Sequence, residues 1–460
     1  MKASTKTLND KVSRCESLEE YKELFKYYDK EISNTNELKN TNIEEFIIPK
    51  GISIINDYAF YESSLKKVTF LDSNVLLGEY SFAKSNISNL DFGIGNINIG
   101  KYAFENNNLT YVNITDNIKY IGEGAFKYNN IESFIIENEM IYILPQYLFY
   151  GNPLTGVLEF GNVNTIDNHV LSGNLREELI IPDTVSSFGK LENCKNLKRL
   201  YLSNKKSGLS IPSDFIFNID SLEELHLGTA KRYNFNNYYG RFDNLKIITV
   251  SEYNEYLYVE NGILFDKKTN AILKFPAKLE LERYNINNEV TKGAFVGLSY
   301  LKNVEINVQL CEGLFAYSNS LENVSLASNI QIIPSNTFIN CENLININLD
   351  KVKKIEDNAF ERCKSLKVIN LTNCELVCKK AFYDCGLTEV IFSNKIKLIK
   401  SNAFSNNKNL EKCDYFDATI EDYAFSGTSF HIKTDEDREY ENFKFKYWLY
   451  KFFPWLILFE

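Results

Sequence analysis

The chain has 460 residues, of which 44% are hydrophobic and 14% aromatic, and its formal net charge is −10. This composition excludes an intrinsically disordered chain, and the length exceeds what one compact hydrophobic core usually fills. The acidic balance and the lack of a long basic run argue against nucleic-acid binding, which depends mainly on Lys and Arg contacts to phosphates.

The N-terminal segment, residues 1–42, is predicted to be a helical cap. Ser17 and Glu20 have capping-box spacing at the start of Ser17–Ile32, and apolar residues follow at helical intervals. A solenoid requires such a cap over its first open core, while a docking helix for a partner is the alternative. The segment has no apolar stretch typical of a secretory signal peptide. An intracellular location is therefore favoured, with the cell surface as the alternative.

From residue 43 onward, one pattern recurs about every 22 residues. A Phe, usually preceded by Ala, has a β-branched residue or Leu five positions before it and a Leu or Ile five or six positions after it. We call this Phe the anchor. A period of about 20–29 residues with alternating apolar residues is typical of a leucine-rich solenoid. The anchors predicted to form the structural core are Phe60, Phe82, Phe104, Phe126, Phe149, Phe295, Phe315, Phe338, Phe360, Phe382, Phe404 and Phe425.

The repeats predict a curved leucine-rich-repeat solenoid with a continuous parallel β-sheet and about 16 turns of ~22 residues. A first arm spans residues 43–250 and a second arm spans residues 281–433. Two strands of the first arm, Leu154–Phe160 and Leu175–Ile181, carry one extra residue and are predicted to contain bulges. Where the Ala-Phe signal weakens, the anchor position is predicted to be taken by Val170, Leu191, Phe217 and Tyr239.

Three cysteines, Cys341, Cys363 and Cys385, lie 22 residues apart, each three residues after its anchor, and Cys194 fits the same position. They are predicted to be small buried residues in one core column. Equivalent residues of neighbouring strands lie ~4.8 Å apart, whereas the Cβ atoms of a relaxed disulfide lie ~3.8 Å apart. We therefore expect reduced thiols.

Residues 251–280 interrupt the repeat. Tyr256–Pro276 contains two turn signals, Glu260–Gly262 and Asp266–Asn270, which separate three short apolar stretches. The pattern predicts a small β-meander inserted between the two arms.

The C-terminal tail, residues 434–460, leaves the repeat pattern and ends in the aromatic stretch Tyr447–Phe459. This stretch is too short to cross a bilayer, and Lys451 and Pro454 interrupt it. It is predicted to be a C-terminal cap. An anchor in the membrane interface, or on a partner, is the alternative.

The repeat in Ile355–Leu371, I-x-x-x-A-F-x-x-C-x-x-L-x-x-I-x-L, resembles the BspA-type leucine-rich repeat. Tyr258–Pro276 is similar to a hairpin module that recurs in that family. The resemblance implies a curved parallel-sheet solenoid with a binding role, often adhesion of surface-displayed members to host or matrix proteins. It provides no catalytic residues.

No cluster typical of an active site, a metal or a cofactor is visible. The only histidines, His169, His226 and His431, are scattered, and no H-E-x-x-H or C-x-x-C motif occurs. Cys374 and Cys378 lack the spacing of a structural zinc site. We therefore predict a chain that is not an enzyme and holds no cofactor.

The two outward columns of the predicted sheet are the candidate binding surface. They combine uncharged polar residues with isolated aromatic and aliphatic ones, which suits a protein partner held around a few anchors. A merely solvated sheet face is the alternative. The predicted function is a non-enzymatic protein-binding scaffold, and the alternative is a surface-displayed adhesin held by its aromatic tail. The candidate partner-binding residues are Tyr111, Asn113, Tyr201, His226, Asn323, Asn346, Asn348, Asn370 and Ile391.

Overall fold

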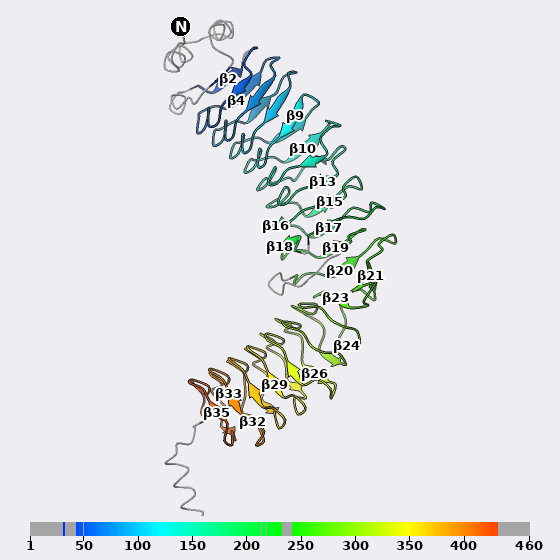
Figure 1. Ribbon diagram of the computed structural model, residues 1–460, viewed down its shortest axis with the longest axis vertical. Coiled ribbons are helices and arrows are strands. Elements are labelled where there is room, and N and C mark those ends of the chain that lie inside the picture. Colours follow the sequence, from blue (N-terminus) through cyan, green and yellow to red (C-terminus); the bar gives the residue numbers. More distant parts are fainter. Residues whose placement is uncertain are drawn as a thin grey trace, which may run out of the picture. The chain divides into compact units, whose positions relative to one another are not determined.

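A computed structural model describes residues 31–32, 43–48, 50–212, 214–217, 219–231 and 242–430 (Figure 1). The chain divides into two compact units. Unit 1 comprises Met1–Leu279 and Glu289–Gly297, and unit 2 comprises Glu280–Asn288 and Leu298–Glu460. Each unit is built from parallel strands, and the described residues contain no helix. The predicted leucine-rich-repeat solenoid of about 16 turns is confirmed.

The predicted N-terminal helix is wrong where the structure describes it. Glu31–Ile32 form strand β1, which pairs in parallel with β3 (Ile54–Ile55). Ile32 is buried, and its carbonyl accepts a hydrogen bond from the amide of Asn56 at 2.9 Å. Parallel pairing with β3 therefore determines the conformation of Ile32, where the sequence spacing had predicted a helix. The rest of residues 1–42, Tyr239 and the aromatic tail lie outside the described residues.

Each turn contributes one strand to what we call ladder 1, in which side chains alternate between core and solvent. In β8, Val112 and Ile114 are buried and Tyr111 is exposed. Ladder 1 of unit 1 contains β2 (Glu45–Ile48), β4 (Lys67–Phe70), β6 (Asn89–Asp91), β8 (Tyr111–Ile114), β10 (Ser133–Ile136), β12 (Leu158–Glu159), β14 (Glu178–Ile180), β17 (Arg199–Tyr201), β19 (Glu224–His226) and β20 (Ile247–Thr249). In unit 2 it contains β24 (Arg283–Ile286), β25 (Asn303–Ile306), β26 (Asn323–Leu326), β28 (Asn346–Ile347), β30 (Val368–Asn370), β32 (Glu389–Ile391) and β34 (Lys412–Cys413).

Within the described part of unit 1, ladder 1 is divided into three sheets, one of which ends at β12 and the next of which begins at β14. The predicted extra residue lies at this division. The buried residues Leu154 and Phe160 are six positions apart, whereas the buried Ile131 and Ile136 of the preceding turn are five positions apart. The additional residue shortens the paired strand.

Arg176 stabilises this irregular region. One guanidinium nitrogen donates to the carbonyls of Leu154 and Gly156, both at 2.6 Å, and Nε donates to the Glu178 carbonyl at 2.9 Å. The partial burial of the side chain lowers its pKa from the usual value. The long side chain thus replaces the strand pairing that the extra residues disrupt.

A second ladder, which we call ladder 2, runs through the segment about five residues before each anchor. The sequence pattern did not predict strands in this segment. The strands of ladder 2 have two to four residues, too few to display a period. In unit 1 it contains β1, β3, β5 (Val75–Leu77), β7 (Ile97–Ile99), β9 (Ile118–Ile121), β11 (Ile143–Leu144), β13 (Thr165–Ile166) and β15 (Ser187–Phe188). The strands β16 (Leu191–Glu192) and β18 (Ile216–Phe217) form a separate parallel pair that follows the positions of this ladder in their turns, Ser187 and Ser210. In unit 2 ladder 2 contains β27 (Ile332–Ile333), β29 (Lys354–Ile355), β31 (Leu376–Val377), β33 (Leu398–Ile399) and β35 (Thr419–Ile420).

The anchor rings form a stacked column in each unit, and all twelve predicted anchors are buried. The ring centroids of Phe360 and Phe382 are 4.9 Å apart with an interplanar angle of 2°. The prediction that Val170 is an anchor is wrong. The Tyr147 and His169 rings stack 5.0 Å apart, and both residues have positive φ, so they occupy equivalent positions in neighbouring turns. The anchor Phe149 follows Tyr147 by two residues, and the equivalent residue after His169 is Leu171, not Val170.

The chain turns sharply around each anchor. The residues two before and two after Phe82, Tyr80 and Lys84, have left-handed φ angles of 54° and 52°. This alternation lets the amides of Tyr80, Phe82 and Lys84 donate to carbonyls of the next turn at 3.0, 2.8 and 2.8 Å. The turn therefore pairs with its neighbour although it is not a strand.

The third residue after an anchor is here called position +3, and in most turns its buried side chain bonds to the anchor carbonyl of the turn before it. Asn129 donates to the Phe104 carbonyl at 2.8 Å, and Cys363 donates to the Phe338 carbonyl at 3.2 Å. The cysteines Cys341, Cys363 and Cys385 are buried, as predicted, and their reduced state stays a prediction. They are hydrogen-bond donors as well as core residues, and burial raises the pKa of the Cys341 thiol to about 12.

The inserted meander forms as the turn signals predict. β21 (Leu257–Glu260), β22 (Ile263–Asp266) and β23 (Ile272–Lys274) pair in antiparallel order. Lys274 is 2% exposed, and its ammonium lies 3.4 Å from the Gly293 carbonyl. Burial lowers the pKa of Lys274 to about 8, although the carboxylate of Asp243 opposes the shift.

Candidate functional site

The nine predicted partner-binding residues lie on or beside ladder 1, but they are distributed over both units. Unit 1 carries Tyr111, Asn113, Tyr201 and His226, and unit 2 carries Asn323, Asn346, Asn348, Asn370 and Ile391. Each group is therefore a separate candidate surface.

In unit 1, Tyr201 and His226 belong to a continuous outward row with Ile180. The strand register places Ile180 beside Tyr201 and Tyr201 beside His226. The Tyr201 and His226 rings stack with centroids 4.1 Å apart and an angle of 2°. Ile180, on the other side of Tyr201, is 58% exposed. We call these three residues the Ile180–His226 patch.

Charged residues of the adjacent outward column are paired with one another or with the patch. Arg199 Nε lies 2.8 Å from Glu178, and this hydrogen bond raises the pKa of Arg199. The His226 ring is held from both sides, because Nε2 lies 3.3 Å from Glu224 and Nδ1 lies 2.6 Å from the Thr249 hydroxyl. Exposed ion pairs contribute little stability, but here they fix the aromatic pair in one orientation.

Tyr111 and Asn113 lie in a different sheet of ladder 1 from the patch. Tyr111 is 48% exposed. Asn113 donates to Glu137 at 3.1 Å, whereas its buried Oδ1 has no partner in the described part of the chain. The structure therefore does not bring these two residues together with Tyr201 and His226.

In unit 2, the predicted asparagines mostly bond to their own chain. Asn323 donates to Asn303 at 2.9 Å, and Asn346 donates to Asn323 at 2.7 Å, so the amides form a chain across three turns. Asn348 both donates to the Leu326 carbonyl and accepts from the Leu326 amide. These bonds use part of the capacity that a partner would need, and a binding role for the asparagines stays a prediction.

The last two candidates in unit 2 are neighbours. Asn370 pairs with Ile391 in the strand register, and the next outward position carries Val368. Val368 is 52% exposed and Ile391 is 39% exposed. Unlike the Ile180–His226 patch, this pair contains no aromatic ring.

Ile180 and Glu178 were missed by the sequence analysis. The extra residue in Leu175–Ile181 displaces the outward positions by one, and the outward columns were followed only through strands of regular length. An isoleucine directly before the inward Ile181, at the end of this strand, was the available signal.

The described residues contain no group of three or more His, Cys, Asp or Glu side chains that could hold a metal ion. They also contain no helix long and apolar enough to cross a membrane. The described surface carries exposed apolar side chains and a pocket in unit 2.

Short parallel strands that alternate with a Phe-centred turn about every 22 residues define a leucine-rich-repeat solenoid. The sequence matches the BspA type leucine rich repeat region over residues 30–156, 164–282, 274–375 and 349–437. The chain belongs to this family, as the resemblance of Ile355–Leu371 predicted.

Three solved structures illustrate the similarity. A leucine-rich repeat protein from Eubacterium ventriosum is 17% identical, with 88% of this chain and 90% of that chain covered and a TM-score of 0.32. A leucine rich cell surface protein from Faecalibacterium prausnitzii is 16% identical, with 89% and 84% covered and a TM-score of 0.30. The pneumococcal vaccine antigen PcpA is 17% identical, with 86% and 85% covered and a TM-score of 0.30. The comparison with curated proteins finds no match.

Proposed function

We propose that the protein is a non-enzymatic scaffold that binds a protein partner through ladder 1 of unit 1, with the Ile180–His226 patch at the centre of the interface. The observation that carries this proposal is the exposure of Ile180 beside the stacked Tyr201 and His226 rings. The repeat explains inward residues by packing, but it places no demand for an apolar side chain at this outward position.

The free energy available at the patch favours a protein ligand. An exposed isoleucine forgoes ~1.5–3 kcal/mol that burial would provide. Interfaces concentrate their binding energy in a few central aromatic and apolar residues surrounded by polar ones. The ion pair of Glu178 and Arg199 and the pair of Glu224 and His226 supply such a rim.

The test begins with proteins captured on the immobilised chain and continues with the dissociation constant of the purified partner. Ile180→Ser and Tyr201→Ala should each weaken binding by ~2 kcal/mol, about thirtyfold. Their melting temperatures should stay near that of the parent, because both positions face solvent.

Ile143→Ser is the matched control, since Ile143 is 55% exposed on ladder 2 of the same unit. It should bind like the parent. If Ile180→Ser and Tyr201→Ala also bind like the parent, the patch is a solvated sheet face. If truncation after Thr434 alone abolishes binding, the aromatic tail is the binding surface. Cell fractionation would test the alternative of a surface-displayed adhesin.

A further inference from the structure

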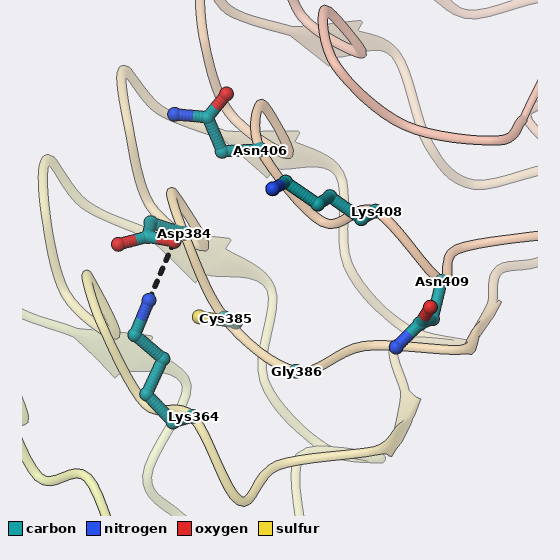
Figure 2. Close-up of a pocket in the computed structure, with 7 residues that line it drawn as sticks. All are labelled: Lys364, Asp384, Cys385, Gly386, Asn406, Lys408 and Asn409. Atoms are coloured by element: carbon teal, nitrogen blue, oxygen red, sulfur yellow. Dashed lines mark ion pairs between the residues drawn. The ribbon is translucent and has the colours of Figure 1, made fainter.

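A notch in unit 2 arises from a chain segment that is one residue shorter than its neighbours. Between position +3 and the next inward Leu, the turn anchored at Phe382 has only Gly386. The preceding turn has Lys364–Ser365 in this segment, and the following turn has Lys408–Asn409. The resulting pocket has a volume of about 260 Å³ and is lined by Lys364, Asp384, Cys385, Gly386, Asn406, Lys408 and Asn409 (Figure 2). We call it the Gly386 notch.

Glycine keeps the floor of the notch open. A Cβ atom at Gly386 would lie 2.0 Å from the Lys364 carbonyl oxygen and 2.6 Å from the Lys367 ammonium. Lys367 itself donates to the Lys364 carbonyl at 3.4 Å. The ammonium of Lys367 thus lies beside the space that a side chain would otherwise fill.

Two further ammonium groups flank the glycine. Lys364 lies one turn before Gly386 and Lys408 lies one turn after it, at equivalent places in the repeat. Figure 2 shows Lys364 and Asp384 pointing toward each other, while Lys408 extends toward Asn406. Lys408 has no carboxylate within ion-pair distance in the described part of the chain.

The charge of the notch is opposite to that of the chain. The lining contains two ammonium groups, Lys364 and Lys408, and one carboxylate, Asp384, and the Lys367 ammonium lies beside Gly386, in a chain of net charge −10. Asp384 is shared, because Lys364 Nζ lies 2.5 Å from one oxygen and Arg362 Nε lies 3.9 Å from the other. One carboxylate cannot neutralise all of these cations.

We propose that the Gly386 notch binds a phosphate or sulfate group. A tetrahedral dianion presents enough oxygens for several ammonium donors at once, and such charge-assisted hydrogen bonds are the strong ones. The side-chain amides of Asn406 and Asn409 supply neutral donors at the rim. Asp384 pairs with Lys364, and its negative charge opposes an incoming anion.

The proposal is tested by calorimetric titration of the full chain with inorganic phosphate, inorganic sulfate and acetate at constant ionic strength. Phosphate and sulfate should bind saturably and more tightly than acetate. Lys408→Met should weaken phosphate binding about tenfold, because it removes a charge-assisted bond. Asp384→Asn should strengthen binding, because it removes the opposing carboxylate without changing the size of the side chain.

Lys397→Met is the matched control. This variant also removes one lysine of unit 2. Lys397 lies directly before the strand β33 and pairs with Glu375 of the preceding turn at 2.6 Å. The variant should leave phosphate binding unchanged, and circular dichroism should show that all variants fold. The proposal is overturned if no anion binds saturably, if acetate binds as tightly as phosphate, or if Lys408→Met and Lys397→Met behave alike. Weaker binding by Asp384→Asn would also overturn it. No residue of the Ile180–His226 patch lines the notch, so this result is independent of the partner assay.

Discussion

Each unit contains a column of anchor rings, but the two units differ in how the amide of the next inward residue is hydrogen-bonded. In the first five repeats of unit 1, from Phe60 to Phe149, the next inward residue follows its anchor after five positions. In unit 2 the spacing is six from Phe315, Phe338, Phe360 and Phe404. The longer segment lets the amide of the inward residue bond within its own turn, as Leu366 does to the Cys363 carbonyl at 3.2 Å.

In three of these five repeats, anchored at Phe82, Phe104 and Phe126, the inward amide bonds to the following turn. Asn129 at position +3 accepts from the Leu109 amide at 3.1 Å, and Asn152 accepts from the Ile131 amide at 2.9 Å. The exception within unit 2 follows the same rule. Because the segment at Gly386 is short, the Leu387 amide bonds to the next turn. Position +3 of that turn is Asn407, whose side-chain oxygen accepts from the Leu387 amide at 3.2 Å.

This comparison explains why cysteine occurs where it does. A thiol donates to the preceding anchor carbonyl but is a weak acceptor. It therefore suffices at Cys363, where the amide of Leu344 in the preceding turn already bonds to the Cys341 carbonyl. At Asn107, Asn129, Asn152 and Asn407 the side-chain oxygen also accepts from the inward amide of the preceding turn. Segment length and the residue at position +3 are thus one feature of the repeat.

The largest expected effect tests what the units share. Phe82→Ala in unit 1 and Phe360→Ala in unit 2 should each cost ~3–5 kcal/mol, because each removes a fully buried ring from the stack. Repeat arrays couple mainly to their neighbours. Hydrogen exchange should therefore rise first in the unit that carries the substitution. Equal loosening of both units would contradict two separately organised cores.

A pH effect should distinguish unit 1. The pKa of Lys274 is lowered from 10.5 to about 8, so the folded state loses stability as the pH falls from 10.5 through 8. A shift of this size corresponds to roughly 3 kcal/mol. Lys274→Met should therefore be more stable than the parent near neutral pH, and the advantage should shrink as the pH rises toward 10.5.

The measurement is the melting temperature of parent and variant between pH 7 and pH 10.5, about the range that the two pKa values bracket. Lys246→Met provides the control, because Lys246 is exposed and pairs with Glu223. A constant difference between Lys274→Met and the parent at every pH would show that Lys274 keeps its ordinary pKa in the folded protein, because the pH dependence vanishes only when both states bind the same number of protons.

The segment-length rule predicts unequal costs at position +3. Asn129→Ala and Asn407→Ala each leave a buried amide and a buried carbonyl without their side-chain partner, at ~1–3 kcal/mol per group. Cys363→Ala removes one weak donor and should cost about 1 kcal/mol. Denaturant unfolding should rank Asn407→Ala with Asn129→Ala, although Asn407 shares unit 2 with Cys363. A ranking by unit instead of by segment length would refute the rule.

Much of this architecture follows from the sequence, because buried positions repeat. The anchors, the solenoid and the meander are predictable since packing fixes Phe60 or Phe360 as an aromatic residue. The second ladder is not, because strands such as Ile54–Ile55 are too short to display alternation. Ile180 was missed because an extra residue displaced it. The link between segment length and Asn or Cys needed the hydrogen bonds, although both patterns are visible in the sequence.

The smallest expected effect concerns the left-handed position two residues before each anchor. In unit 1 it carries mainly tyrosines, such as Tyr58, Tyr80 and Tyr102, whereas in unit 2 it carries mainly residues that tolerate this conformation, such as Asn336, Asn358 and Asn402. The Tyr80 ring stacks between Tyr58 and Tyr102, at 5.2 and 5.0 Å. Left-handed backbone costs a residue with a Cβ roughly 1–2 kcal/mol, and each aromatic pair returns ~0.5–1.5 kcal/mol.

These terms nearly cancel, so Tyr80→Asn should change the stability of unit 1 by less than about 0.5 kcal/mol. The reverse substitution, Asn358→Tyr, gains no ring partner, because the equivalent residues of the adjacent turns are Asn336 and Lys380. It should therefore cost about 1 kcal/mol. Denaturant titrations of both variants decide the point. A loss of several kcal/mol for Tyr80→Asn would mean that the tyrosine stack, and not the anchor column alone, holds unit 1 together.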